Sequence, residues 1–261
     1  MPGHPAIGGP VSGSRHVVFV GDAMAAVAAG VIEVRTLIGH APVIVGGLAV
    51  LSRLSNPYRA TVDLDLVDRL LGDLPQLEVL RAADGAETVE PAAVLLPTRY
   101  GSVKVDVLEV RQVELDHPSD DPGDRLHASA HAWANDTATD MTIEVIHTGG
   151  ERVVVTTPVA EPGPLIAMKL QAVMNRSADK QGTDLLDIVH LMLDESTRPA
   201  ALAQIRSADA ATAQDIAIHV DLWFTRKRPQ SLQRIHAVGG RDITTDDLDL
   251  VAELLTDATQ R

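Results

Sequence analysis

The sequence predicts an α/β protein in two parts: a first half with a small mixed or antiparallel sheet flanked by helices, then an all-helical half. Up to about residue 158, short apolar and β-branched segments alternate with segments of helical periodicity. From Pro158 onward, every apolar repeat has helical spacing. We therefore expect one domain over residues 15–158 and a helical domain over residues 159–261.

Local patterns predict the individual elements. Residues 1–14 are rich in Gly, Pro and Ser and lack periodicity, which predicts a flexible lead. Strands are expected at residues 16–20, 42–45, 61–67, 89–96, 103–110, 141–146 and 152–156. Helices are expected at residues 22–37, 46–54, 67–80, 125–135, 165–174, 184–193, 200–206, 208–224 and 246–256.

The composition excludes several classes of site. The chain has no cysteine, which rules out disulfides, thiolate zinc sites and cysteine nucleophiles. Its net charge of −14 argues against broad, non-specific binding of nucleic acid, although a local patch can still bind an RNA. There is no apolar run of the roughly 18 residues that a membrane-spanning helix needs, and no signal-peptide pattern. We therefore expect a cytoplasmic protein without a membrane partner.

A glycine turn followed by paired carboxylates is the main candidate site. Gly46 and Gly47 follow an apolar strand and open a helix, where free backbone amides can bind phosphate. Asp63 and Asp65 lie at i and i+2 of the next strand and therefore point to the same face. Two adjacent carboxylates are costly unless a cation lies between them. This pattern indicates metal-assisted transfer from a nucleotide.

Asp106 is a third candidate carboxylate, isolated between two valines in a later strand. If that strand lies beside the strand of Asp63 and Asp65, the three carboxylates can bind two Mg²⁺ ions roughly 4 Å apart. The alternative is a solvated acidic face of the sheet, which a D-x-D pattern alone would favour. The glycine turn and Asp106 together favour the metal site.

Two groups of residues occur in the order of a known family. The first resembles the polymerase-β-like nucleotidyltransferases and consists of Gly46-Gly47, Asp63-x-Asp65 and Val105-Asp106-Val107. The second is similar to the lysine-then-D-x-x-D motif of the AbiEii-type nucleotidyltransferase toxins and consists of Lys169, Asp184 and Asp187. The resemblance covers about residues 40–110 and 160–195. AbiEii-type proteins are the toxin halves of type IV toxin–antitoxin pairs.

The resemblance implies a nucleotidyltransferase domain over residues 15–158 and a Mg²⁺-dependent reaction. A nucleoside monophosphate would pass from an NTP to a hydroxyl, with the 3′ end of a tRNA as an acceptor and an antitoxin as a partner. Asp63, Asp65 and Asp106 would be the catalytic metal ligands, and Asp106 would also deprotonate the attacking hydroxyl.

The resemblance also implies roles for the nucleotide-binding residues. The backbone of Gly46 and Gly47 would approach the phosphates, and Lys169 would contact the triphosphate or the charge of the transition state. Asp184 and Asp187 would form a second acidic pair, with Asp184 nearer the site. The chain departs from many relatives, which carry Ser at the position of Gly47, and a loop expected over 178–183 lengthens the gap before Asp184.

The same residues have structural interpretations. Lys169 lies in an apolar helix, so its ammonium group needs an anionic partner or must reach water along the core. Asp184 and Asp187 lie one turn apart on one helix face. Their alternative role is helix N-terminal charge behind a Thr183 cap.

Further candidates are weaker. Arg59 and Thr61 precede the carboxylate strand, where Arg59 is best interpreted as a turn residue. His127 and His131 have a zinc-compatible spacing but are better interpreted as surface histidines. The basic cluster Arg226-Lys227-Arg228 with Arg234 is more typical of a solvated loop than of an RNA-binding site.

Two other functions stay open. The same machinery can nucleotidylate a protein side chain or a small molecule such as an aminoglycoside. From a different class, the chain can be a non-catalytic nucleotide-binding module.

Overall fold

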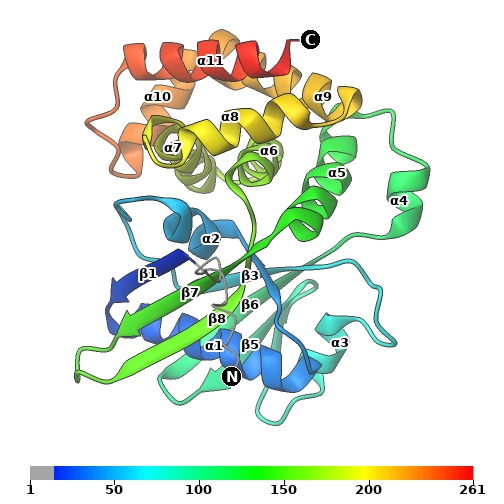
Figure 1. Cartoon of the computed structure of the whole chain (residues 1–261), viewed down its shortest axis with the longest axis vertical. Coiled ribbons are helices and arrows are strands. Elements are labelled where there is room, and N and C mark those ends of the chain that lie inside the picture. The colour runs from blue at the N-terminus through cyan, green and yellow to red at the C-terminus, as the bar shows by residue number, and fades with distance from the viewer. Residues whose placement is uncertain (1–14, 261) are drawn as a thin grey trace, which may run out of the picture.

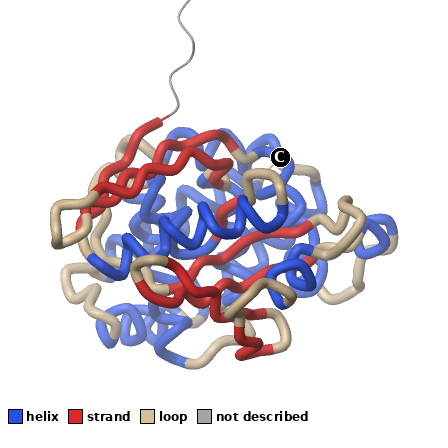
Figure 2. Tube along the Cα trace, turned by 90° about the horizontal axis from the view of Figure 1, so that it is seen from below, coloured by secondary structure: helices blue, strands red, loops and turns tan. Residues whose placement is uncertain are grey.

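One mixed sheet of eight strands runs through the N-terminal part of the molecule, and a group of helices packs on one side of it (Figure 1). The computed structural model describes residues 15–260, so the flexible lead expected over 1–14 lies outside the described residues. Viewed from below, the strands form a twisted band across the molecule with helices beside it (Figure 2). No helix in the described part of the chain is long and apolar enough to cross a membrane.

The sheet has the spatial order β1-β7-β8-β2-β3-β6-β5-β4. Its strands are β1 (Arg15–Val20), β2 (Val43–Val45), β3 (Asp63–Asp68), β4 (Glu87–Glu90), β5 (Ala93–Thr98), β6 (Gly101–Glu109), β7 (Thr139–Ile146) and β8 (Arg152–Val159). The mixed sheet is confirmed, but it is larger than expected. The parallel pairing of β2 with β8 joins β1, β7 and β8 to the other strands.

The helices of the first part are α1 (Asp22–Ile38), α2 (Gly46–Arg53), α3 (Gln76–Arg81), α4 (Gln112–Asp116) and α5 (Pro122–Thr137). After β8 come α6 (Pro162–Ala172), α7 (Ala178–Leu193), α8 (Arg198–Ser207), α9 (Ala210–Val220), the π-helix η1 (Asp221–Arg226), α10 (Arg228–Ala237) and α11 (Thr245–Thr259). No strand follows β8 in the described residues. Because α5 packs against α6 and α9, the division into two domains near residue 158 stays a prediction.

The helix expected over 67–80 is wrong. Strand β3 continues to Asp68, and the chain is irregular until α3 begins at Gln76. The carboxylate of Asp68 accepts hydrogen bonds from the backbone N–H groups of Leu70 at 2.8 Å and Gln76 at 2.7 Å. These local bonds replace those of a helix, and two leucines of this segment, Leu71 and Leu74, are exposed.

Three further expectations are corrected. Helix α7 begins at Ala178, so residues 178–183 are helical rather than a loop. Thr183 lies inside this helix, where its hydroxyl donates to the carbonyl of Asp179, and it does not cap the helix. Because α7 begins six residues before Asp184, Asp184 and Asp187 are interior helix residues, and their interpretation as N-terminal helix charges is wrong.

The strand expected over 89–96 is a β4–β5 hairpin.

Arg53 joins the sheet to the first C-terminal helix. At the end of α2, its guanidinium donates to the carbonyls of Val159 and Ala160 and to the Thr139 hydroxyl. It also forms an ion pair with Glu161 at 3.1 Å. This buried network connects the segment entering α6 to the glycine-initiated helix α2, and so positions the two walls of the site described next.

Candidate active site

The three candidate carboxylates lie on one face of neighbouring strands. Strands β3 and β6 are parallel, with Asp63 aligned with Lys104 and Asp65 aligned with Asp106. The alternate residues of both strands are buried on the opposite face. The expected juxtaposition of Asp106 with the two earlier aspartates is therefore confirmed. Lys104, two residues before Asp106, shares their face because strand side chains alternate.

The glycine turn brings a helix terminus against Asp65. Gly46 has φ +62°, and a Cβ at this position would lie 2.0 Å from Asp65 Oδ2. The next backbone N–H, that of Gly47, donates to the same oxygen at 3.4 Å. Glycine is thus required at residue 46 both for its left-handed conformation and for the close approach of the carboxylate.

Side chains from another segment lie where a serine side chain at residue 47 would begin. A Cβ at Gly47 would lie 3.1 Å from the Thr61 hydroxyl oxygen and 3.2 Å from Arg59 Nη2. Two polar side chains from the segment before β3 therefore occupy the space next to the glycine. Thr61 and Arg59 both line the cleft beside the carboxylates.

Two of the carboxylates are in surroundings that disfavour their charge. Burial raises the pKa of Asp65, and repulsion from Asp106 adds to this against the attraction of Lys169. Burial also raises the pKa of Asp106, although Lys104 acts in the opposite direction. The Lys104 ammonium group lies 3.2 Å from Asp106 Oδ1 and 2.9 Å from Glu90 Oε1. A further cation near these carboxylates would be stabilising.

Lys169 on α6 is buried and held by both aspartates of α7. Its Nζ lies 2.6 Å from Asp184 Oδ1 and 2.8 Å from Asp187 Oδ2. Burial acts to lower the pKa of Lys169, but the two carboxylates outweigh it and raise the pKa above its ordinary value. The expectation of an anionic partner is confirmed, and the alternative of an ammonium group reaching water is wrong.

The two aspartates have different second partners. Asp184 accepts hydrogen bonds from Arg176, whereas Asp187 is fully buried and accepts from Arg59 and from the Tyr58 hydroxyl. Burial opposes ionisation of Asp187, but Lys169 and Arg59 lower its pKa below the ordinary value. Arg59 is thus part of a buried network rather than a simple turn residue. Asp184 lines the cleft, as expected for the nearer of the pair.

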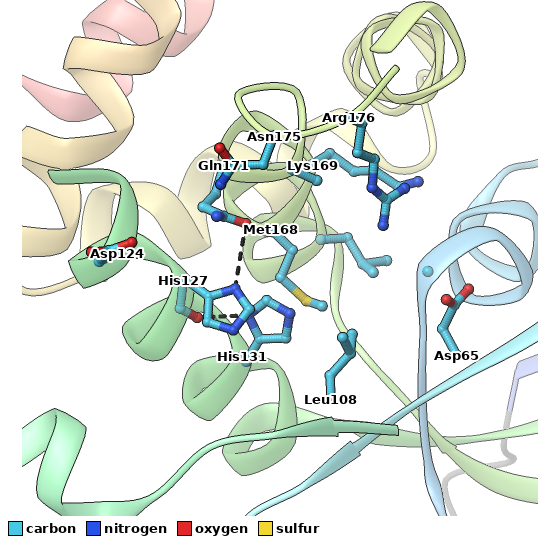
Figure 3. A pocket seen from close by; sticks show the side chains of 13 residues that line it. Asp65, Leu108, Asp124, His127, His131, Met168, Lys169, Gln171, Asn175 and Arg176 are labelled. Carbon is cyan, nitrogen blue, oxygen red and sulfur yellow. Dashed lines mark hydrogen bonds between the residues drawn. The ribbon is translucent and has the colours of Figure 1, made fainter. Parts of the chain in front are cut away.

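These groups surround one continuous cleft. A hollow of about 320 Å³ is lined by Gly47, Arg59, Thr61, Asp63, Asp65, Glu90, Lys104, Asp106, Leu108, Lys169, Arg176, Lys180, Thr183 and Asp184. An adjoining cavity of about 470 Å³ shares Asp65, Leu108, Lys169 and Arg176 with it and also includes Gly46 (Figure 3). Sequence reasoning did not single out Lys104, Arg176 or Lys180 as site residues. Only Lys104 had a usable signal, its two-residue spacing from Asp106.

The carboxylates fit a metal ion only in part. In the described residues, no group of three or more His, Cys, Asp or Glu side chains is arranged to bind a metal ion. Asp106 is paired with Lys104, and Asp65 contacts the Gly47 amide. Mg²⁺ needs only one or two carboxylates when substrate phosphates supply other ligands. The residues therefore fit a Mg²⁺ ion that arrives with a triphosphate, and the two-metal arrangement stays a prediction.

The structure also shows the surroundings of two weaker candidates, the histidine pair and the basic cluster. His131 is buried and His127 lies beside it in the adjoining cavity, so their interpretation as surface histidines is wrong. In the basic cluster, Arg226 and Arg228 form ion pairs with aspartates, and Lys227 and Arg234 lie over the Trp223 ring. These contacts favour a structural role for the cluster.

Comparisons with known proteins give a family for this chain and a solved structure that it resembles. Residues 38–260 match the family described as nucleotidyl transferase AbiEii toxin, type IV toxin–antitoxin system. A structure search also matches the chain to an antigenic nucleotidyltransferase-like protein from Paracoccidioides brasiliensis, with a TM-score of 0.39 and 18% identity. That match covers 83% of this chain and 93% of the other. No curated protein matches the sequence.

Proposed function

Because the chain belongs to the AbiEii family of nucleotidyltransferase toxins, we propose that it transfers a nucleoside monophosphate from an NTP to a hydroxyl group in a Mg²⁺-dependent reaction. The observation that carries this proposal is the alignment of Asp65 with Asp106 beside the Gly46 turn. This arrangement brings carboxylates, the glycine backbone at the start of α2 and the ammonium group of Lys169 around one cleft.

In the proposed reaction, the acceptor oxygen attacks the α-phosphorus and the bond to the bridging oxygen breaks, releasing pyrophosphate. In this scheme, Asp106 accepts the proton of the attacking hydroxyl. Mg²⁺, when bound by Asp63, Asp65 and Asp106, would neutralise phosphate charge. Lys169, kept protonated by Asp184 and Asp187, stabilises negative charge on the phosphates.

The residues around the glycine turn complete the proposed phosphate site. The Gly47 backbone and the Thr61 hydroxyl lie together at the start of α2, and Thr61 would take the place of the serine hydroxyl of many relatives. Arg176 and Lys180 line the same cleft as Lys104. This local concentration of cations, in a chain of net charge −14, suits a polyanionic ligand.

For the acceptor, we propose an RNA hydroxyl, that of the 3′ end of a tRNA. We further propose that a cognate antitoxin opposes the activity. Nucleotidylation of a protein side chain or of a small molecule is the second candidate, since the acidic surface does not favour long contacts with RNA. A non-catalytic nucleotide-binding module is the third.

A labelling experiment tests these proposals. The purified protein is incubated with Mg²⁺, each α-labelled NTP in turn, and total cellular RNA and protein. The Asp63→Ala variant is compared with Asp73→Ala, which removes an exposed carboxylate outside the cleft. We expect label in a tRNA-sized band with the wild type and Asp73→Ala, and none with Asp63→Ala. Label in a protein band would support the second candidate, and retained transfer by Asp63→Ala would overturn the assignment.

A further inference from the structure

The wall of the cavity adjoining the catalytic cleft has apolar, polar and charged side chains, the charged ones being Asp65, Asp124, Lys169 and Arg176 (Figure 3). Its apolar side chains are Leu108, Leu165, Met168 and Ala172. Its other polar side chains are His127, His131, Gln171 and Asn175. Asp65 and Lys169 connect the cavity to the cleft. Apolar walls with a few polar groups suit a flat heterocycle that carries hydrogen-bonding groups on its edge.

One polar group of this cavity has a defined hydrogen-bonding character. His131 is 4% exposed, and its Nδ1 lies 2.6 Å from the backbone carbonyl oxygen of His127. A carbonyl oxygen can only accept, so Nδ1 carries a proton. Burial, together with the nearby His127, lowers the pKa of His131 to about 3, and the ring is neutral at physiological pH. In this tautomer, Nε2 can only accept a hydrogen bond.

The accepting nitrogen is free to meet a ligand. Because Nδ1 bonds back to helix α5, Nε2 lies on the side of the ring that faces away from that hydrogen bond. The ring itself lines the cavity (Figure 3). Within residues 15–260, Nε2 has no hydrogen-bond partner. Gln171, on α6, adds a buried amide to the cavity wall, with Oε1 3.4 Å from His127 Nδ1.

We infer that this cavity binds the base of the incoming nucleoside triphosphate, and that His131 Nε2 accepts a hydrogen bond from an exocyclic amino group of that base. The inference rests on the proposed function, which supplies the triphosphate, and on the shared lining residues Asp65 and Lys169. A base with a carbonyl oxygen in place of the amino group would bring two acceptors together. CTP should therefore bind better than UTP, and ATP better than ITP.

Isothermal titration calorimetry with the full chain tests this inference. CTP, UTP, ATP and ITP are each titrated in Mg²⁺ buffer without an acceptor. The cavity fits either the pyrimidine pair, CTP and UTP, or the purine pair, ATP and ITP. Within the pair that fits, we expect the triphosphate with the exocyclic amino group to bind about tenfold more tightly than the other, as for one well-formed hydrogen bond. His131→Phe, which keeps an aromatic ring but removes the acceptor, should bring this ratio close to one.

His219→Phe is the matched control. His219 is also buried, and its Nδ1 likewise bonds to a carbonyl four residues earlier, that of Asp215 at 2.7 Å. It does not line the cavity, so this variant should keep the wild-type ratio.

The possible results of the titrations test the inference and the proposed function separately. Equal binding within both pairs by the wild type would overturn the inference and leave the proposed function standing. The absence of binding by any triphosphate would overturn both. A folded His131→Phe protein that keeps the wild-type ratio would also overturn the inference. If this variant does not fold, the wild-type ratios alone decide.

Discussion

The ammonium group of Lys169 lies 2.6 Å from Asp184 Oδ1, in a buried contact that joins α6 to α7 beside the catalytic cleft. The residues are 15 positions apart, and each compensates part of the buried charge of the other. This contact keeps a protonated amine beside Asp65, where the proposed reaction places the phosphates. It also makes the stability of the helical part depend on a residue of the site.

Removing the Lys169 ammonium group should therefore destabilise the protein. Lys169→Met leaves Asp184 with Arg176 and Asp187 with Arg59, so two buried carboxylates lose a shared partner. We expect the free energy of unfolding to fall by about 3 kcal/mol, as for other broken buried pairs. Urea denaturation measures this change. Lys227→Met, at an exposed lysine over Trp223, is the control and should have a much smaller effect. Equal changes for both variants would contradict the prediction.

Substitution of Gly46 should disrupt both conformation and site. Gly46→Ala combines a φ of +62° with a Cβ 2.0 Å from the Asp65 carboxylate. We expect loss of nucleotidyl transfer together with a lower melting temperature. Gly39→Ala isolates the conformational effect, since φ is +80° there but no atom lies within 4 Å of the added Cβ. This control should cost only about 1 kcal/mol of stability and retain transfer. Wild-type transfer by Gly46→Ala would show that Asp65 can move away without consequence.

The buried network around Asp187 predicts a pH dependence of stability. The pKa of Asp187 is lowered in the folded protein by Lys169 and Arg59 against the effect of burial. A lowered folded-state pKa adds stability above the unfolded-state pKa, and this stability is lost as pH falls through the folded-state pKa. Arg59→Met removes one of the stabilising cations. The difference in unfolding free energy between wild type and Arg59→Met should therefore be largest near neutral pH and narrow on acidification.

Urea denaturation at a series of pH values measures this difference. Arg35→Met removes an exposed arginine that has no carboxylate partner in the described residues. Its small effect should not change with pH. A constant difference between wild type and Arg59→Met would show that Arg59 acts only through packing.

Several features of the site follow from short stretches of sequence. The alternation around Asp63 and Asp65 predicted that these two carboxylates share a face, and the pairing of β3 with β6 brings Asp106 beside them. The glycine turn was also predicted from a few consecutive residues. The motif order also identified the AbiEii family, which the match over residues 38–260 confirms.

The errors arose where distant or competing interactions decided the structure. The apolar stripe expected over 67–80 has a good helical period, but the Asp68 carboxylate binds two backbone amides and holds a loop instead. His131 was assigned to the surface because nothing near it in sequence shows that α6 covers α5.

The sequence by itself determined which residues can form the carboxylate strands and the glycine turn, because side-chain alternation and backbone freedom are properties of a few consecutive residues. Only the tertiary structure decided how the charges are compensated. Arg59 and Asp187 are 128 positions apart, yet they form one buried network with Lys169. A buried charge is stable only with partners at hydrogen-bonding distance, and the packing of α7 against α6 and the segment before β3 supplies those partners.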